Sequence, residues 1–253
     1  MLPYPIATTR TQKLEMIEHL KERLLQSYGN QILAIGAYGS IALESEGPFS
    51  DIELHVITKD FHPLKSFEFV YGEFKIEIGS LEKNQFIAEA RKLDDSWAIK
   101  AGAYINILPI HDPDDVFGQV QHFPIEISHA AIRELMKEFM VWEPYETIAK
   151  IRTNYHNVNL AYLTLGTHDL LWQTAKLIGL ANKSYYSTRA RTFEESLEMQ
   201  SLPSGYKELL KLFMDGKLED KEQVYHLCEN LWTGLNQWYE KIGLNYRLTN
   251  LPF

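Results

Sequence analysis

Two short runs of residues near the start of the sequence combine small residues, a hydroxyl and carboxylates in an order that could support phosphoryl chemistry. The first is Gly39-Ser40, which follows an apolar run, and the second is Asp51-Ile52-Glu53. A glycine-serine turn lets backbone N–H groups and a hydroxyl approach phosphate oxygens closely. On a strand, Asp51 and Glu53 share one face, and such a pair suits Mg²⁺, which binds carboxylates together with phosphate oxygens. The two runs predict a site that binds a nucleoside triphosphate with metal ions beside it.

A third carboxylate, Glu77, lies in a run that alternates strictly between apolar and charged residues. The apolar face carries Phe74, Ile76 and Ile78, and the charged face carries Glu73, Lys75 and Glu77. If this strand lies beside the one that carries Asp51 and Glu53, three carboxylates could hold two ions for an in-line phosphoryl displacement. The alternative for each acidic run taken alone is an ordinary exposed strand face.

Glu146 and Lys150 are four residues apart in a predicted helix that Pro144 would begin at its first turn. Their spacing alone favours a surface ion pair. The functional alternative makes Glu146 a general base on an acceptor hydroxyl and places Lys150 on a phosphate.

Other common catalytic and metal-binding patterns are missing from the sequence. The nine histidines show no HxH or HxxxH spacing, and the single cysteine leaves no Cys pair, which argues against a zinc site. Neither GxxxxGK[ST] nor GxSxG occurs. Cys228 cannot form an internal disulfide, which fits a reducing cytoplasm, and we interpret it as a small core residue.

Composition and charge narrow the range of partners. The chain has 253 residues, 45% of them hydrophobic, and a formal net charge of −9. An acidic surface argues against a nucleic-acid partner and would suit a cationic small molecule, although on charge alone acidity for solubility is the favoured explanation. No apolar run approaches the roughly 18 residues of a membrane span. Residues 1–5 lack the pattern of a signal peptide, so we expect a cytoplasmic protein with no membrane partner.

The elements that must position these residues change in type along the chain. Before about residue 125, the periodicity predicts a first helix that ends at Gly29 and a second helix at 82–93. It also predicts strands at 31–38, 51–58, 67–71, 73–79 and 104–110. Pro109 places the last strand near a sheet edge. After residue 125 only helical periods remain, at 126–142, 145–163, 168–182, 187–200, 204–214 and 221–242. Strands followed by helices predict an α+β fold, or two domains divided near residue 125.

At this point the residues resemble the polymerase-β-type nucleotidyltransferase superfamily and, within it, the kanamycin nucleotidyltransferase family of aminoglycoside 4′-O-nucleotidyltransferases. The similar runs are 34–40, 47–53, 72–77, 107–110, 149–152, 202–206 and Pro252-Phe253. The resemblance implies a nucleotidyltransferase domain at 1–125, with a mixed sheet and helices. It also implies an all-helical domain at 126–253 for acceptor binding and dimerisation.

The resemblance also implies a reaction and roles for residues. An aminoglycoside hydroxyl, the 4′-OH, attacks the α-phosphorus of ATP or another nucleoside triphosphate in a Mg²⁺-dependent step, which confers antibiotic resistance. The metal ligands are then Asp51, Glu53 and Glu77, the phosphate contacts come from Gly39, Ser40, Lys75 and Lys150, and the general base is Glu146. Family members form homodimers, so Glu146 would act on a nucleotide held mainly by the other chain.

One position departs from the family pattern, two acidic residues are assigned on charge alone, and two other functions remain as alternatives. The family has an arginine three residues after the motif serine, where this chain has Leu43, and leucine cannot make bidentate phosphate contacts. Glu73 and Glu143 are proposed partners for the ammonium groups of the acceptor, on charge alone. The alternatives to an aminoglycoside acceptor are the same transfer to another small-molecule or protein hydroxyl, and a non-catalytic nucleotide-binding protein.

Overall fold

A computed structural model describes residues 4–251 and 253 of the chain, so Pro252 and the first three residues lie outside the described part. The described residues form two compact units. The first unit runs to Lys92 and resumes at Lys100–Ile127, and the second comprises Leu93–Ile99 and Ser128–Phe253.

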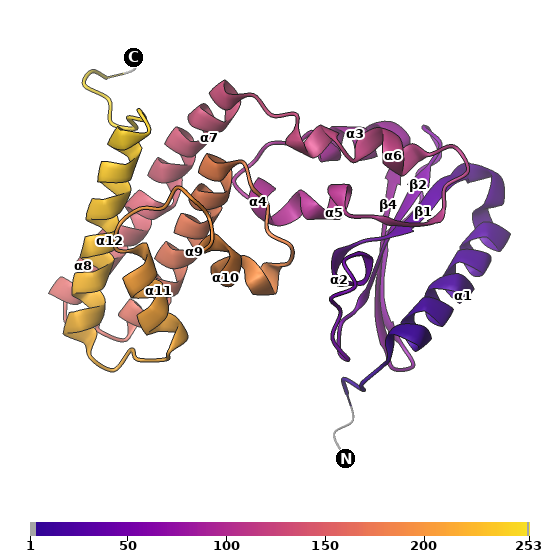
Figure 1. Ribbon diagram of the computed structural model, residues 1–253, viewed down its shortest axis with the longest axis horizontal. Helices are drawn as coiled ribbons and strands as arrows, with labels where there is room; N and C mark the ends of the chain where they lie inside the picture. Colours follow the sequence, from indigo (N-terminus) through magenta and orange to yellow (C-terminus); the bar gives the residue numbers. More distant parts are fainter. Residues whose placement is uncertain (1–3, 252) are drawn as a thin grey trace. The chain divides into compact units, whose positions relative to one another are not determined.

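The first unit is built on a five-stranded mixed sheet in the order β3-β4-β2-β1-β5 (Figure 1). The strands are β1 (Ile32–Ala37), β2 (Ile52–Thr58), β3 (Phe67–Tyr71), β4 (Phe74–Glu82) and β5 (Leu108–His111). β2 and β4 run parallel, whereas the pairs β1–β2, β1–β5 and β3–β4 are antiparallel. β5 is an edge strand, as predicted from Pro109.

Helices cover the two faces of this sheet. They are α1 (Arg10–Tyr28), α2 (Gly39–Ala42), α3 (Lys83–Ala90), α5 (Gly102–Ile105) and α6 (Val116–Val120). On one face Ile17 and Leu24 of α1 pack with Leu54 and Ile76 of the strands, and on the other Phe86 and Phe117 pack with Ala34 and Ile57. Figure 1 shows α1 on one side of the strands and α3 and α6 on the other. Ile52, Leu54 and Val56 therefore face α1, and Glu53, His55 and Ile57 face the opposite way.

The second unit is helical. After α4 (Trp97–Lys100), which begins in this unit, it contains α7 (His129–Trp142), α8 (Pro144–His156), α9 (Tyr162–Asn182), α10 (Thr192–Ser196), α11 (Tyr206–Met214) and α12 (Lys221–Lys241). α9 contacts α7, α8, α10, α11 and α12, and its buried positions on several sides agree with this central place. The α+β fold predicted from the sequence is confirmed. None of the helices in the described part of the chain combines the length and apolar character needed to cross a membrane.

Three element predictions were wrong in extent. The predicted strand at 104–110 is a helical turn, α5, followed by the shorter β5, because Tyr104 turns inward to stack on His55 at 5.5 Å between ring centroids. The predicted helix at 145–163 ends at His156, and Val158 takes a left-handed φ of 59° before α9 begins. The predicted helix at 187–200 is the 3-10 turn Arg189–Arg191 and the five-residue α10.

The thiol of Cys228 is expected to be inert in the folded protein. Its side chain is fully buried on α12, and burial raises the pKa of the thiol to about 11, so little thiolate exists near neutral pH. A thiol-specific chromogenic disulfide reagent at pH 8 should therefore label the native protein far more slowly than the protein in denaturant. Rapid labelling of the native protein would contradict the buried position.

Candidate active site

The Gly39-Ser40 turn lies directly against the strand that carries the acidic residues. Gly39 has a φ of +66°, which favours glycine, and begins α2. A Cβ at Gly39 would lie 2.1 Å from Oε2 of Glu53, so the missing side chain leaves the space that this carboxylate occupies. The backbone N–H of Tyr38 donates to the carbonyl of Glu53 at 3.1 Å. The turn and the carboxylate are thus one local structure.

The three predicted carboxylates are close enough to interact. Asp51 immediately precedes β2, and the parallel register pairs Glu53 directly with Glu77 on β4, so both side chains leave the same face of the sheet. Burial and the charges of Asp51 and Glu77 raise the pKa of Glu53 to about 7, against an opposing effect of Lys75. Burial contributes most to this shift and the two neighbouring carboxylates add to it, so a cation bound beside Glu53 would oppose it.

Lys75 is the cationic side chain that faces Asp51. Its Nζ lies 3.1 Å from Oδ2 of Asp51 and 3.0 Å from Oε1 of Glu68 on β3. These carboxylates, Glu68 first, raise the pKa of Lys75, which stays charged. Glu73 lies in the turn that joins β3 to β4, beside the same hairpin.

The carboxylates do not form a ready-made metal site. Among residues 4–251 and 253, no group of three or more His, Cys, Asp or Glu side chains is arranged to hold a metal ion. Lys75 occupies one oxygen of Asp51, whereas Tyr38 donates to Oε1 of Glu77 alone and leaves its other oxygen available. Metal binding by Asp51, Glu53 and Glu77 therefore stays a prediction, and the donor set fits it because carboxylate oxygens are the ligands that Mg²⁺ prefers.

Two aromatic residues next to the carboxylates were missed in the sequence. The hydroxyl of Tyr38 donates to Oε1 of Glu77 at 3.3 Å, and burial with the charges of Glu53 and Glu77 raises the pKa of this hydroxyl, which stays protonated. The Tyr38 ring stacks on His55, and burial lowers the pKa of His55 to about 4, so this imidazole is neutral. Tyr38 directly precedes Gly39, and His55 is two residues after Glu53 on the same strand face. These positions beside Gly39 and Glu53 were the signal in the sequence that could have identified the two aromatic residues.

A guanidinium stands beside the loop that contains Leu43, although from a distant part of the chain. Arg10, at the start of α1, donates from Nη1 to the carbonyl of Ile41 at 3.2 Å and to Glu46 at 2.8 Å. Leu43 itself caps α2. Arg10 therefore stabilises the loop between the Gly-Ser turn and Asp51. Its guanidinium is already engaged there by the ion pair with Glu46.

Glu146 and Lys150 belong to the second unit, where they form the ion pair that their spacing predicts. Nζ of Lys150 lies 2.8 Å from Oε1 of Glu146, and their side chains are 55% and 59% exposed. Glu146 lies in the first turn of α8, which Pro144 begins as predicted. The geometry is that of an ordinary surface pair, so the role of Glu146 as a base stays a prediction.

Glu143 lies at the start of α8 in acidic surroundings. Its carboxylate accepts a hydrogen bond from Nε2 of Gln173 at 2.9 Å. It lines a cavity of about 240 Å³ together with Asp95, Glu138 and Trp142. Asp95 already pairs with Nζ of Lys176, so the groups of this cavity that suit an ammonium group are the carboxylates of Glu138 and Glu143 and the indole of Trp142.

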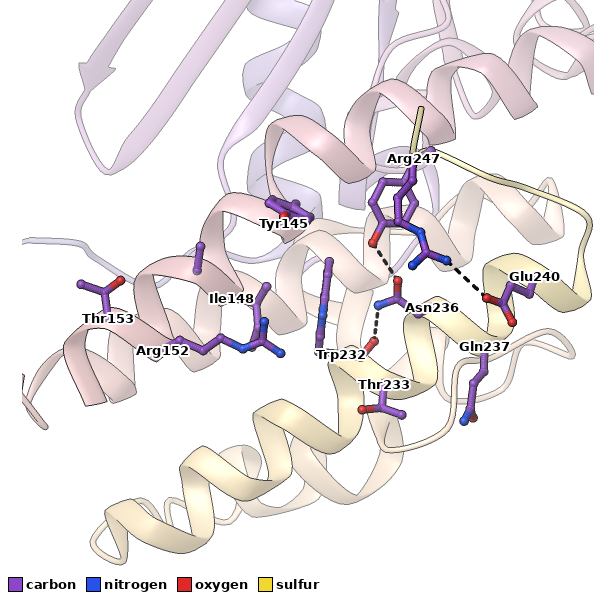
Figure 2. A pocket seen from close by; sticks show the side chains of 12 residues that line it. Tyr145, Ile148, Arg152, Thr153, Trp232, Thr233, Asn236, Gln237, Glu240 and Arg247 are labelled. Atoms are coloured by element: carbon purple, nitrogen blue, oxygen red, sulfur yellow. Dashed lines mark hydrogen bonds and ion pairs between the residues drawn. The ribbon is translucent and has the colours of Figure 1, made fainter. Parts of the chain in front are cut away.

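A larger cavity of about 750 Å³ lies between α8, α12 and the chain that follows α12 (Figure 2). Its aromatic lining includes Tyr145 and Trp232, whose rings meet edge to face at 5.8 Å between centroids. The hydroxyl of Tyr246 donates to Asn236 at 2.7 Å. None of the site residues predicted from the sequence lines this cavity, although Ala149 and Arg152 from the run 149–152 do, and Tyr145 neighbours Glu146 on α8.

Comparisons with known proteins agree with this architecture. The family model described as "KNTase C-terminal domain" matches residues 114–245. An "Aminoglycoside nucleotidyltransferase (4')" from Staphylococcus aureus is 30% identical over 239 residues, which are 94% of this chain and 94% of that protein. A protein of the same name from a Bacillus species is also 30% identical over 239 residues, with the same 94% coverage of both chains.

A solved structure is similar in fold. The nucleotidyltransferase-like protein from Exiguobacterium sibiricum 255-15 has a TM-score of 0.52 and 14% sequence identity, over 89% of this chain and 75% of that chain. This similarity bears on the fold alone. The two relatives, matched over 94% of both chains, and the family model together show that the chain belongs to the kanamycin nucleotidyltransferase family and is a nucleotidyltransferase.

Proposed function

We propose that this protein transfers a nucleoside monophosphate from ATP or another nucleoside triphosphate to the 4′-hydroxyl of an aminoglycoside, and so confers resistance. The observation that carries the proposal is the pairing of Glu53 with Glu77 beside the Gly39-Ser40 turn. The names of the two relatives supply the acceptor class. A cytoplasmic location and a homodimer are part of the proposal, with no nucleic acid or membrane as partner.

At the α-phosphorus the reaction forms one bond and breaks one, and a proton moves from the acceptor hydroxyl. The acceptor oxygen bonds to the α-phosphorus, the bond from that phosphorus to the bridging oxygen breaks, and pyrophosphate leaves with the electron pair. Glu146 takes the proton of the acceptor hydroxyl. The turn at Gly39-Ser40, with Lys75 and Lys150, holds phosphate oxygens through N–H, hydroxyl and ammonium groups.

Asp51, Glu53 and Glu77 would hold Mg²⁺ in this reaction. The support is the parallel register that pairs Glu53 with Glu77 next to Asp51, and burial together with these charges raises the pKa of Glu53 to about 7. Bound there, the metal would neutralise charge on the phosphate oxygens. Lys75 would then exchange its contact with Asp51 for a phosphate oxygen and keep its contact with Glu68.

The acceptor is proposed to be a polyamine sugar because acidic groups occur in both units. Glu143 lines the small acidic cavity with Asp95 and Glu138, and Glu73 lies on the β3–β4 hairpin near Lys75. Ammonium groups pair favourably with such carboxylates.

The direct test is an acceptor assay. Protein, ATP and Mg²⁺ are incubated with kanamycin or tobramycin, pyrophosphate release is measured, and the drug mass is followed by mass spectrometry. The expected result is pyrophosphate release with a gain of one nucleoside monophosphate on the drug. The matched control, 3′,4′-dideoxykanamycin B, lacks the 4′-hydroxyl and should not react. No release across an aminoglycoside panel would overturn the acceptor class, and reaction of the dideoxy compound would move the modified position.

Substitution of Gly39 by alanine should lower both stability and turnover. The left-handed φ costs a non-glycine residue about 1–2 kcal/mol, and the new Cβ would displace the carboxylate of Glu53. Gly216→Ala is the matched control, since Gly216 has a φ of +69° with open space around it. We expect denaturant titration to show a similar loss for both variants, and only Gly39→Ala to lose turnover. Equal turnover in Gly39→Ala and Gly216→Ala would show that the contact between Gly39 and Glu53 does not matter for catalysis.

A further inference from the structure

Tyr38 connects the Gly-Ser turn to the backbone of Glu53 and to the carboxylate of Glu77. Its backbone N–H donates to the carbonyl of Glu53 at 3.1 Å, and its hydroxyl donates to Oε1 of Glu77 at 3.3 Å. Its own position is immediately before Gly39, where it caps α2 with an extended φ of −128° and ψ of −168°. One residue therefore contacts both strands whose register brings Glu53 and Glu77 together.

The ring of Tyr38 is held in place by stacking on the imidazole of His55. It lies nearly parallel to the imidazole of His55, with 4.1 Å between centroids and 17° between planes. His55 is only 6% exposed, and its Nε2–H donates to the carbonyl of Ala103 at 2.9 Å. Phe86 packs edge to face against His55, with 5.2 Å between the ring centroids. The Tyr38 hydroxyl cannot swing away from Glu77 without breaking this stack.

The hydroxyl of Tyr38 restricts where the Glu77 carboxylate can point. A carboxylate on a strand turns freely about its last torsions, and repulsion from Glu53 and Asp51 would push it away from them. A donor on one oxygen fixes that oxygen and leaves the other available. Partners of this kind orient metal-binding carboxylates in many proteins.

We propose that Tyr38 is a positioning residue, which holds Glu77 ready to share a divalent cation with Asp51 and Glu53, and that His55 is the platform that holds Tyr38. The inference rests on the proposed function, because that function supplies the cation. Tyr38 itself touches neither substrate nor metal in this role. Its hydroxyl acts through Glu77 alone.

Tyr38→Phe tests the role because it removes the hydroxyl and keeps the stacked ring. We expect the dissociation constant of Mn²⁺, measured by calorimetry with a non-hydrolysable ATP analogue, to rise about 10- to 100-fold, as for other partners of metal ligands. The midpoint of thermal unfolding should stay near that of the wild type. The Mg²⁺ concentration for half-maximal turnover should rise, and saturating Mg²⁺ should restore turnover, which a damaged fold would not allow.

Tyr71→Phe is the matched control, since Tyr71 is 57% exposed on β3 and also loses only a hydroxyl. It should bind Mn²⁺ as the wild type does. Wild-type affinity in Tyr38→Phe would overturn the positioning role and leave the proposed function standing. A wild-type protein that binds no Mn²⁺ with nucleotide would overturn the metal site, and the inference with it.

Discussion

Asp51→Asn is expected to lower turnover by on the order of 10³-fold while the protein remains folded. Loss of a group that only orients a metal ligand costs about 10- to 100-fold, so loss of a direct ligand should cost more. Asparagine keeps the size of the side chain and removes its charge. The remaining partner, Lys75, is 45% exposed and keeps Glu68, so no buried charge is left unpaired, and the lost pair should change the free energy of unfolding by about 0–1 kcal/mol.

Glu68→Gln distinguishes metal binding by Asp51 from the ion pair that Asp51 forms with Lys75. Glu68 is the other carboxylate on Lys75, at 3.0 Å against 3.1 Å for Asp51, so its substitution disturbs Lys75 to a similar degree. We expect Mn²⁺ affinity, measured by calorimetry, to fall strongly in Asp51→Asn and to stay near wild type in Glu68→Gln. An equal fall in both would mean that Asp51 serves only to hold Lys75. Unchanged Mn²⁺ affinity in Asp51→Asn would remove this residue from the metal site.

The acidic strand faces were predictable because a strand has a period of two residues. Ile52, Leu54, Ile76 and Ile78 are buried as the alternation predicts. Which acidic residues meet was a different question. The pairing of Glu53 with Glu77 depends on a parallel register between segments joined by the β3 hairpin, and nothing local in either segment encodes that register.

Tyr38 and the turn at Tyr104 could not be predicted for a related reason. Tyr104 belongs to an apolar run that favours a strand, and its helical turn is stabilised by stacking on a histidine far away in the sequence. The role of Tyr38 depends on a contact with Glu77, 39 residues away. Tertiary contacts of this kind override local preference. Residue type and spacing predicted the carboxylates, and only the fold revealed the rings that support them.

Glu146→Gln is expected to lower turnover by about 10²–10⁴-fold with little change in nucleotide affinity, the range for loss of a general base. Glutamine has nearly the same shape, cannot take a proton from the acceptor, and leaves Lys150 free to bind phosphate. Single-turnover kinetics would measure the chemical step, and calorimetry with the ATP analogue would measure affinity.

Glu134→Gln is the matched control for a mere surface pair. Glu134 pairs with Lys137 on α7 at 2.8 Å, the same distance as Glu146 to Lys150, and its side chain is 69% exposed. We expect Glu134→Gln to leave turnover unchanged. If Glu146→Gln behaved in the same way, the ion pair on α8 would be only part of the surface.

The variants Asp51→Asn and Glu146→Gln can together show whether Glu146 acts in the active site of its own chain or in that of a partner chain. In a homodimer with shared sites, an Asp51→Asn subunit paired with a Glu146→Gln subunit has one site with both lesions and one site with neither. Random mixing makes half of the dimers mixed, so turnover should return to about one quarter of the wild-type value. If each site is built within one chain, every site keeps a lesion and mixing restores nothing. Restored activity would therefore place the base of one subunit beside the carboxylates of the other, and the exposed position of Glu146 in the single chain would follow from that arrangement.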